Sequence, residues 1–173
     1  VKAKKPVAAD QVVLQEQALL RAGLCQGQLP VPKWADSEKT FKQFIAAYPK
    51  HDHIRTAQHG LGLALKSQKK YDVALKEFES VLSEAIRDEL GAHSQFLVGE
   101  CYLEQKMYDE SMAEYVKVET LYAFPQWQSK AIYEMAEALD GKGDKVNAQT
   151  QYKRLIQKFP DTPAATAAKG KLK

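Results

Sequence analysis

Apolar positions follow a helical spacing in the stretch Lys69–Leu82, which reads KKYDVALKEFESVL. Its apolar residues succeed one another at intervals of three or four: Tyr71, Ala74, Phe78 and Val81. Residues at this spacing share one face of an α-helix, and the charged residues between them fall on the other faces. The stretch is therefore predicted to be an amphipathic helix that buries one side.

The same pattern recurs every 37 residues along the chain. Besides the copy above, the positions are Trp34, Ser37, Phe41 and Phe44; Tyr108, Ser111, Tyr115 and Val118; and Lys145, Ala148, Tyr152 and Leu155. In every copy a small residue lies one turn before an aromatic residue, an alternation that lets neighbouring helices interdigitate. Four copies at one spacing indicate a helical repeat.

Another helix is predicted before each of the last three copies. Gly62, Gly99 and Ala136 recur there at the same 37-residue spacing, among apolar residues at helical positions. Glycine inside a helix costs roughly 1 kcal/mol relative to alanine, so its recurrence indicates close contact between helices. Each unit is therefore a pair of helices, and the fold class is all-α.

The expected organisation is a flexible basic arm followed by one repeat domain. The boundaries are residues 1–9 for the arm, 10–173 for the domain, 10–50, 51–88, 89–125 and 126–161 for the repeats, and 162–172 for a capping helix. The helix that starts at Tyr71 is expected to run to about Ile86. The aromatic segment 124–127 is expected to be a loop before a helix that starts at Gln128.

This pattern resembles the tetratricopeptide repeat family, whose unit is a helix–turn–helix with this pattern of Gly, Tyr, Ala and aromatic positions and a closing proline. Pro49 and Pro160 each lie eight residues after the aromatic residue of their copy, as the resemblance requires. The third copy has Pro125 two residues later, and the second has no proline. The resemblance implies a right-handed superhelical solenoid of about four repeats whose first helices line a concave groove.

Two junctions between helices narrow the resemblance. Tyr48-Pro49-Lys50-His51 and the segment FPDTPAA at 159–165 look like the junctions of bacterial cell-envelope repeat adaptors, such as the Tol-Pal coordinator and outer-membrane assembly lipoproteins. This likeness implies a periplasmic, envelope-associated protein, with a cytoplasmic location as the alternative. The start at Val1 is expected to reflect a fragment or a processed chain.

Composition limits the other function classes. The chain has 173 residues, of which 45% are hydrophobic and 27% charged, as in ordinary folded domains. A net charge of +3 gives no reason to expect nucleic acid as a partner. No uncharged apolar run approaches the roughly 18 residues of a membrane span, so no integral membrane segment is expected.

The sequence favours neither metal binding nor catalysis. His51, His53 and His59 are close in sequence, but their spacing does not place them on one helix face, and a structural zinc site needs four converging ligands. The motifs of metalloproteases, serine hydrolases and phosphate-binding loops do not occur. The sequence therefore predicts no metal, no cofactor and no enzyme activity.

A partner-binding groove is the positive expectation. By helical spacing, the residues of the first helices that face the groove are predicted to be Thr56, His59, Leu63, Lys66, His93, Phe96, Glu100, Leu103, Lys130, Tyr133, Glu137 and Asp140. Phe96 and Tyr133 occupy equivalent places and could anchor a peptide, or they could only pad neighbouring helices. Glu100, Glu137 and Asp140 suggest an acidic groove that suits a neutral or basic segment.

Three hypotheses follow for the function. The first is a non-catalytic scaffold that binds a protein or peptide in the groove, in a cell-envelope process. The second is a structural segment of a larger repeat protein that mediates self-association, with a homo-oligomer as the product. The third is a regulatory module of a longer multidomain protein.

Overall fold

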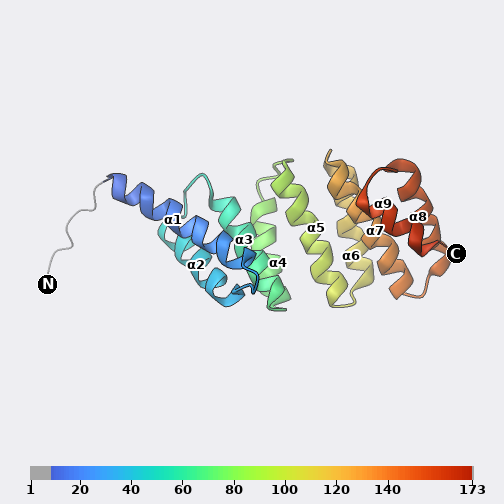
Figure 1. Ribbon diagram of the computed structural model, residues 1–173, viewed down its shortest axis with the longest axis horizontal. Helices are drawn as coiled ribbons and strands as arrows, with labels where there is room; N and C mark the ends of the chain where they lie inside the picture. Colours follow the sequence, from blue (N-terminus) through green and yellow to red (C-terminus); the bar gives the residue numbers. More distant parts are fainter. Residues whose placement is uncertain (1–8, 173) are drawn as a thin grey trace. The chain divides into compact units, whose positions relative to one another are not determined.

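The computed structural model describes residues 9–172 of the chain, with side chains from Gln15 onward. All elements among these residues are α-helices (Figure 1). In chain order they are α1 (Ala9–Gln28), α2 (Trp34–Ala47), α3 (Ile54–Ser67), α4 (Tyr71–Leu82), α5 (Glu89–Glu104), α6 (Tyr108–Leu121), α7 (Pro125–Gly141), α8 (Lys145–Lys158) and α9 (Pro163–Lys171). The predicted all-α class, with a short closing helix, is confirmed. The predicted arm lies outside the described residues, apart from Ala9.

Helix α4 ends earlier than predicted, at Leu82 and not near Ile86. The five residues that follow are all exposed, so they offer no apolar face that could hold another helical turn against a core. Ala85 turns the chain with a φ of 55°. Asp88 then caps α5, where its Oδ1 accepts a hydrogen bond of 2.7 Å from the backbone N–H of Gly91.

Helix α7 begins earlier than predicted, so the expected loop at 124–127 is wrong. Pro125 stands in its first turn, a position where proline needs no backbone N–H and where its fixed φ suits a helix. The N–H groups of Trp127 and Gln128 both donate to the carbonyl oxygen of Phe124 at 3.0 Å. Trp127 is therefore a helical residue whose side chain is held by α7.

Contacts divide the chain into two compact units, Val1–Glu77 and Phe78–Lys173. In the first unit, α1 packs on α2, α2 on α3, and α1 also touches α3. The ring of Phe41, 1% exposed, lies against two glycines. A Cβ on Gly23 would stand 2.8 Å from the ring, and one on Gly60 would come closer still. These two glycines are also 37 residues apart, so the repeat spacing marks them as equivalent positions.

In the second unit, each helix from α5 to α8 packs on the next one along the chain, and α7 also touches α5 and α9. Tyr115 of α6 is fully buried and presses on Gly99 of α5, where an added Cβ would meet the ring at 2.5 Å. The closing helix α9 buries Ala165 and Ala168 in a cluster with Tyr152 of α8. The predicted burial of small residues at the helix contacts is thus met at Gly99 and also at Gly62 and Ala136.

The turns inside the repeats share one backbone conformation. Lys69, Lys106 and Gly143 are 37 residues apart and all have positive φ, at 60°, 61° and 89°. After each of them, the next N–H bonds to a carbonyl oxygen five residues back, from Lys70 to Leu65, from Met107 to Tyr102 and from Asp144 to Leu139. This is the Schellman arrangement that ends a helix through a left-handed residue. The repeat therefore fixes the turns as well as the helices.

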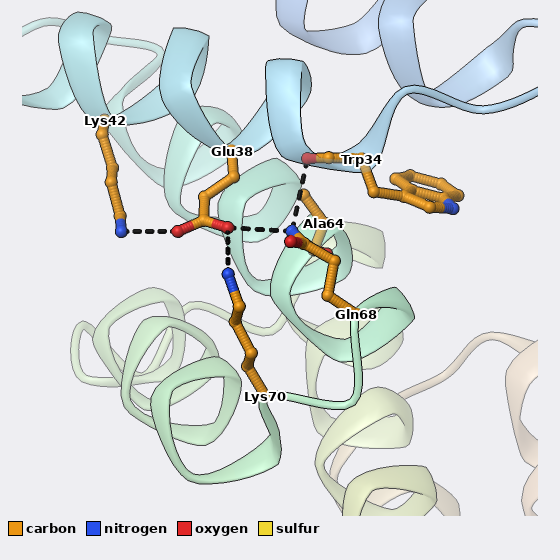
Figure 2. Close-up of polar contacts among 6 residues, drawn as sticks. All are labelled: Trp34, Glu38, Lys42, Ala64, Gln68 and Lys70. Atoms are coloured by element: carbon orange, nitrogen blue, oxygen red, sulfur yellow. Dashed lines mark hydrogen bonds and ion pairs between the residues drawn. The ribbon is translucent and has the colours of Figure 1, made fainter.

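A polar cluster joins α2 to the turn before α4 (Figure 2). The Glu38 carboxylate accepts hydrogen bonds from Lys42 Nζ at 2.6 Å, Lys70 Nζ at 2.8 Å and Gln68 Nε2 at 2.8 Å. The same Gln68 nitrogen donates to the carbonyl oxygen of Ala64 at 3.0 Å, near the end of α3. The hydrogen bond from Lys42, followed by that from Lys70, lowers the pKa of Glu38 to about 2. One carboxylate thus ties three segments of the first unit together.

Gly143→Ala is expected to lower the free energy of unfolding by about 1 kcal/mol, because an L-residue is strained at this left-handed position. An added methyl group would meet no atom within 4 Å, so packing does not enter. Gly170→Ala is the matched control: it also meets open space but lies in helix α9, and it should gain about 0.5 kcal/mol. Urea unfolding measures both; equal effects of the two changes would contradict the turn assignment.

Glu38→Gln is expected to lower the free energy of unfolding by about 1 kcal/mol at pH 7, since exposed lysine partners are screened by solvent. The pKa of the Glu38 carboxyl group is about 2 in the folded chain, whereas an ordinary glutamate has a pKa of 4.5. The unfolded chain therefore takes up the proton first, and this contribution is present above about pH 5 and is lost as the pH falls toward 2.

The check is urea unfolding of wild type and variant at several pH values between 2.5 and 7. The stability difference between them should shrink steadily as the pH falls. Glu110→Gln, an exposed glutamate on α6, serves as the control and should show no such convergence. A difference that is constant with pH would show that Glu38 acts through packing alone.

Candidate interaction surface

Helices α5 and α7 are in contact in the second unit, and side chains from both helices make up one surface. We call this surface the α5–α7 face and define it by His93, Glu100 and Leu103 of α5 and Trp127, Lys130 and Glu134 of α7. The spacings from His93 to Glu100 and from Trp127 to Glu134 are two helical turns, so each set shares a helix side. Four of the predicted groove residues, His93, Glu100, Leu103 and Lys130, therefore belong to this face.

The best-ordered part of this face is a stack centred on Trp127. The imidazole of His93 lies parallel to the indole ring, with a centroid separation of 4.1 Å and an interplanar angle of 17°. Lys130 Nζ lies 4.4 Å from the centroid of the Trp127 ring, a cation–π contact. The indole N–H donates to Glu89 Oε1 at 3.3 Å. Predicted residues from two helices are thus joined by a tryptophan that we had assigned to a loop.

Phe96 is not a surface anchor, so this part of the predicted groove is wrong. Its side chain is only 6% exposed and belongs to a core cluster with Tyr115 and Met135. The ring centroids of Phe96 lie 5.5 Å from Tyr115 and 5.6 Å from Trp127. Phe96 therefore supports the Trp127 stack from below, which is the padding role we had considered as the alternative.

The neighbouring surface between α7 and α9 holds Tyr133, Glu137 and Asp140 of the predicted set. Tyr133 is half-buried, and its ring centroid lies 5.7 Å from that of Tyr152. Glu137 accepts a hydrogen bond from the Tyr152 hydroxyl and forms an ion pair of 2.6 Å with Lys171 of α9. Asp140 is exposed, and it borders a cleft of about 350 Å³.

The ion pair decides the charge at Glu137. Burial alone would raise the pKa of this carboxyl group, but the hydrogen bonds from Lys171 and Tyr152 outweigh burial and hold the pKa below its usual value. The hydrogen bond to Glu137 raises the pKa of Lys171 in turn. Glu137 is therefore ionised and already balanced by a cation of the same chain, so it adds little to the predicted acidity of the groove.

The four predicted residues of α3 belong to the first unit and are described with it. His59 is 9% exposed and therefore buried, so the prediction that it faces an open groove is wrong. Thr56, Leu63 and Lys66 are half-buried. Leu63 borders a narrow cleft of about 80 Å³, next to Phe41 and Gly60.

Other kinds of site were sought in the described part of the chain. No group of three or more His, Cys, Asp or Glu side chains in residues 9–172 could hold a metal ion. None of the described helices has the length and apolar character needed to cross a membrane. Cys25 is exposed and Cys101 is buried, and both are free thiols.

Comparison with known proteins gives a consistent family match. Profiles of the tetratricopeptide repeat match residues 17–51, 59–124 and 130–162, which together make up most of the chain. No curated protein was found to match the chain by sequence. The profile matches cover stretches in both units.

Solved structures share the fold at low sequence identity. MamA 41-end from Desulfovibrio magneticus RS-1 superimposes with a TM-score of 0.69 and 20% identity, covering 82% of this chain and 74% of that one. The nearly identical TPR-like repeats from Podosopora anserina, as the Q17M variant, give 0.71 and 14%, covering 89% and 81%. A tetratricopeptide repeat protein from Parabacteroides merdae gives 0.70 and 14%, covering 90% and 57%. At these identities the likeness supports the fold alone.

Glu137→Gln is expected to weaken the attachment of α9, because the amide can accept the Tyr152 hydrogen bond but cannot attract Lys171. The cost should be about 0.5–1 kcal/mol, since both partners are partly exposed to solvent. Hydrogen exchange of the amides in the last turn of α9 should quicken by the corresponding factor of about two to five. Asp140→Asn, on the same helix but exposed, is the control; equal effects from both variants would argue against the ion pair.

Proposed function

Because the chain belongs to the tetratricopeptide repeat family, whose members generally mediate protein–protein interactions, we propose that it is a non-catalytic scaffold that binds a protein segment on the α5–α7 face. The observation that carries this proposal is the Trp127 stack, in which residues from two helices are held as one rigid aromatic surface. Aromatic residues that are fixed before binding lose little conformational entropy in a complex, and they dominate binding energies.

The rest of the face suits a polypeptide segment. His93, Leu103 and Trp127 are half-buried, so they expose apolar contact area while their neighbours restrict the side-chain conformations. Lys130 is exposed and Glu100 is half-buried, so polar contacts surround the aromatic centre. An apolar centre with a polar rim is typical of protein interfaces.

A cell-envelope setting is part of the proposal and rests on the junction resemblance alone. The segment 159–165 runs from the C-cap of α8 into the first turn of α9, where Thr162 Oγ1 accepts a hydrogen bond of 3.2 Å from the N–H of Ala165 and Pro163 stands in the first turn. This capped start is a feature of the junction on which the resemblance was based. Separation of the source cells into periplasmic, membrane and cytoplasmic fractions, followed by immunodetection, tests the compartment directly.

The interaction itself is tested by affinity capture with two matched double variants. Lys130→Glu with Asp140→Lys changes two exposed residues of α7 and leaves the net charge unchanged; Lys130 belongs to the α5–α7 face, and Asp140, on the neighbouring surface, restores the charge balance. Lys153→Glu with Glu110→Lys makes the same exchange on α8 and α6. Wild type and the second variant should capture the same partner from source lysate, identified by mass spectrometry. The amount that the first variant captures should be lower by about tenfold or more.

All three proteins should have the same thermal midpoint within about 2 °C, since the altered residues are exposed. Equal capture by both double variants would contradict binding on this face. A second copy of the chain is the other protein that the face could bind, and sedimentation velocity distinguishes it: self-association that the α7 variant abolishes would assign the face to an oligomer.

A further inference from the structure

The excess positive charge of this chain belongs to the first unit. Residues 1–77 contain thirteen Lys and Arg against seven Asp and Glu, whereas residues 78–173 contain twelve against fifteen. A surplus of one sign raises the local concentration of oppositely charged partners and speeds their association. An acidic partner is therefore attracted to the first unit and not to the second.

An open cleft of about 520 Å³ follows helix α2 in the first unit and is bordered by the turn before α4. We call it the α2 groove and define it by Ala35, Glu38, Lys39, Lys42 and Ala46 of α2 and Lys70 of the turn. The two alanines are the first and last α2 residues that line it, and a helix rise of 1.5 Å per residue places them about 16 Å apart. An extended peptide of about five residues has this length.

The Glu38 carboxylate holds two of the three lysines at the groove. Figure 2 shows Lys42 and Lys70 reaching it from separate segments, at Nζ–O distances of 2.6 and 2.8 Å. The Glu38 side chain is 13% exposed, whereas those of Lys42 and Lys70 are 54% and 47% exposed. An ammonium group has three N–H donors, and each of these lysines uses one on Glu38. Both cations are thus fixed in place and keep donors for a further acceptor.

Positive charge exceeds negative charge in the α2 groove. Lys39 is exposed and has no ion-pair partner among the described residues. Glu77 of α4 is a second carboxyl group to count: burial raises its pKa, and the charge of Lys42 lowers it. Three lysines therefore stand against two carboxyl groups, and one positive charge remains unbalanced even when both carboxyl groups are ionised.

The second unit has none of these lysines at the equivalent places. Two 37-residue repeats later, the lysines are replaced by Ala113, Val116 and Asp144, and Glu38 is replaced by Met112. Helices α2 and α6 nevertheless have the same length of 14 residues. The repeat fold therefore does not require these charges, so the α2 groove departs from the repeat at positions that packing leaves open to binding.

We propose that the α2 groove binds an acidic segment of a protein partner, with one Asp or Glu carboxylate between Lys42 and Lys70 and a second one at Lys39. The carboxylate oxygens accept the remaining ammonium donors. Glu38 holds two of the cations before binding, so little side-chain entropy is lost in the complex. Charge complementarity is the argument for this occupant, and the inference does not depend on the α5–α7 face.

A short acidic segment suits the number of cations better than a polyanion does. Typical nucleic-acid-binding proteins make about six to ten phosphate contacts. Clusters that recognise anionic lipids contain about four to eight basic residues. The α2 groove has three lysines, two of which already contact Glu38. Its concave form also favours a peptide over the flat surface of a bilayer.

The test is a titration of the full chain with pentaglutamate at about 0.15 M salt, followed through the NMR resonances of the backbone amides. Pentaglutamine is a peptide of the same length without charge. Pentaglutamate should shift the amide resonances of α2 and of residues 68–70, and pentaglutamine should leave them unchanged. Shifts confined to the second unit, or equal binding of the two peptides, would overturn the proposal.

Two matched double variants separate the groove from overall charge. Lys39→Gln with Lys70→Gln removes two cations of the groove, whereas Lys69→Gln with Lys153→Gln removes two exposed lysines that do not line it. Each exposed ion pair lost should weaken pentaglutamate binding about threefold, so the groove variant should bind about tenfold more weakly. The control should change affinity by less than about twofold. Equal losses would mean that the peptide follows net charge, which contradicts the proposal.

Lys39→Gln alone keeps the test valid if the loss of Lys70 weakens the fold. Lys39 has no ion pair to lose among the described residues, so the thermal midpoint should equal that of wild type while pentaglutamate affinity falls about threefold. Unchanged affinity in this single variant, with a lower midpoint in the groove variant, would assign the lysines to stability and overturn the proposal.

Other occupants of the α2 groove give different results. An oligothymidylate, or vesicles that contain phosphatidylserine, could bind more tightly than pentaglutamate and lose this binding in the groove variant alone. That result would assign the groove to nucleic acid or to a membrane and would overturn the proposal. Sedimentation velocity tests a second copy of the chain: self-association that the groove variant loses and the control keeps would replace the partner by the chain itself.

Discussion

The contact of one large ring with one residue that lacks a side chain holds this repeat together. Tyr115 on Gly99, and Phe41 between Gly23 and Gly60, bring two helix backbones closer than any larger residue would allow. A glycine inside a helix costs roughly 1 kcal/mol in propensity, whereas burial of an aromatic side chain gains about 2–3 kcal/mol. Burial of the ring therefore outweighs the cost of the glycine, and the ring–glycine contact determines which helix faces meet. The remaining faces are then free to differ between repeats.

The turns impose a second constraint that acts through the backbone. Lys69, Lys106 and Gly143 all adopt the left-handed conformation, although only the last is a glycine. Two lysines accept a strained backbone because the Schellman hydrogen bonds and the packing of the next helix require the chain to reverse there. Strain at a fixed place in each repeat is thus offset by the contacts of the helices on either side. Helix length, turn and ring contact are parts of the same repeating unit.

The 37-residue spacing was enough to predict the all-α fold, the order of the helices and the burial of residues such as Gly99, because a spacing reports which positions are equivalent. It could not predict what happens where the copies differ. The sequence around Pro125 predicts a loop, but proline is also compatible with the first turn of a helix, and the sequence alone does not separate the two. Phe96 was placed on the surface by spacing, yet a ring of that size beside Trp127 is more stable when buried.

Function in such a fold depends on the positions that break the repeat. Trp127 has Leu90, Ala164 and, in the first unit, His53 at its equivalent places, so among the described residues a tryptophan stands at this position in one repeat alone. Glu134 has Lys171 at its equivalent place, and Lys171 forms an ion pair with Glu137, so this position carries opposite charges in two successive repeats. Equivalent backbone positions therefore carry side chains of different charge. Under the proposed function, these two departures would distinguish the α5–α7 face from its neighbour, since the packing positions that define the repeat are buried.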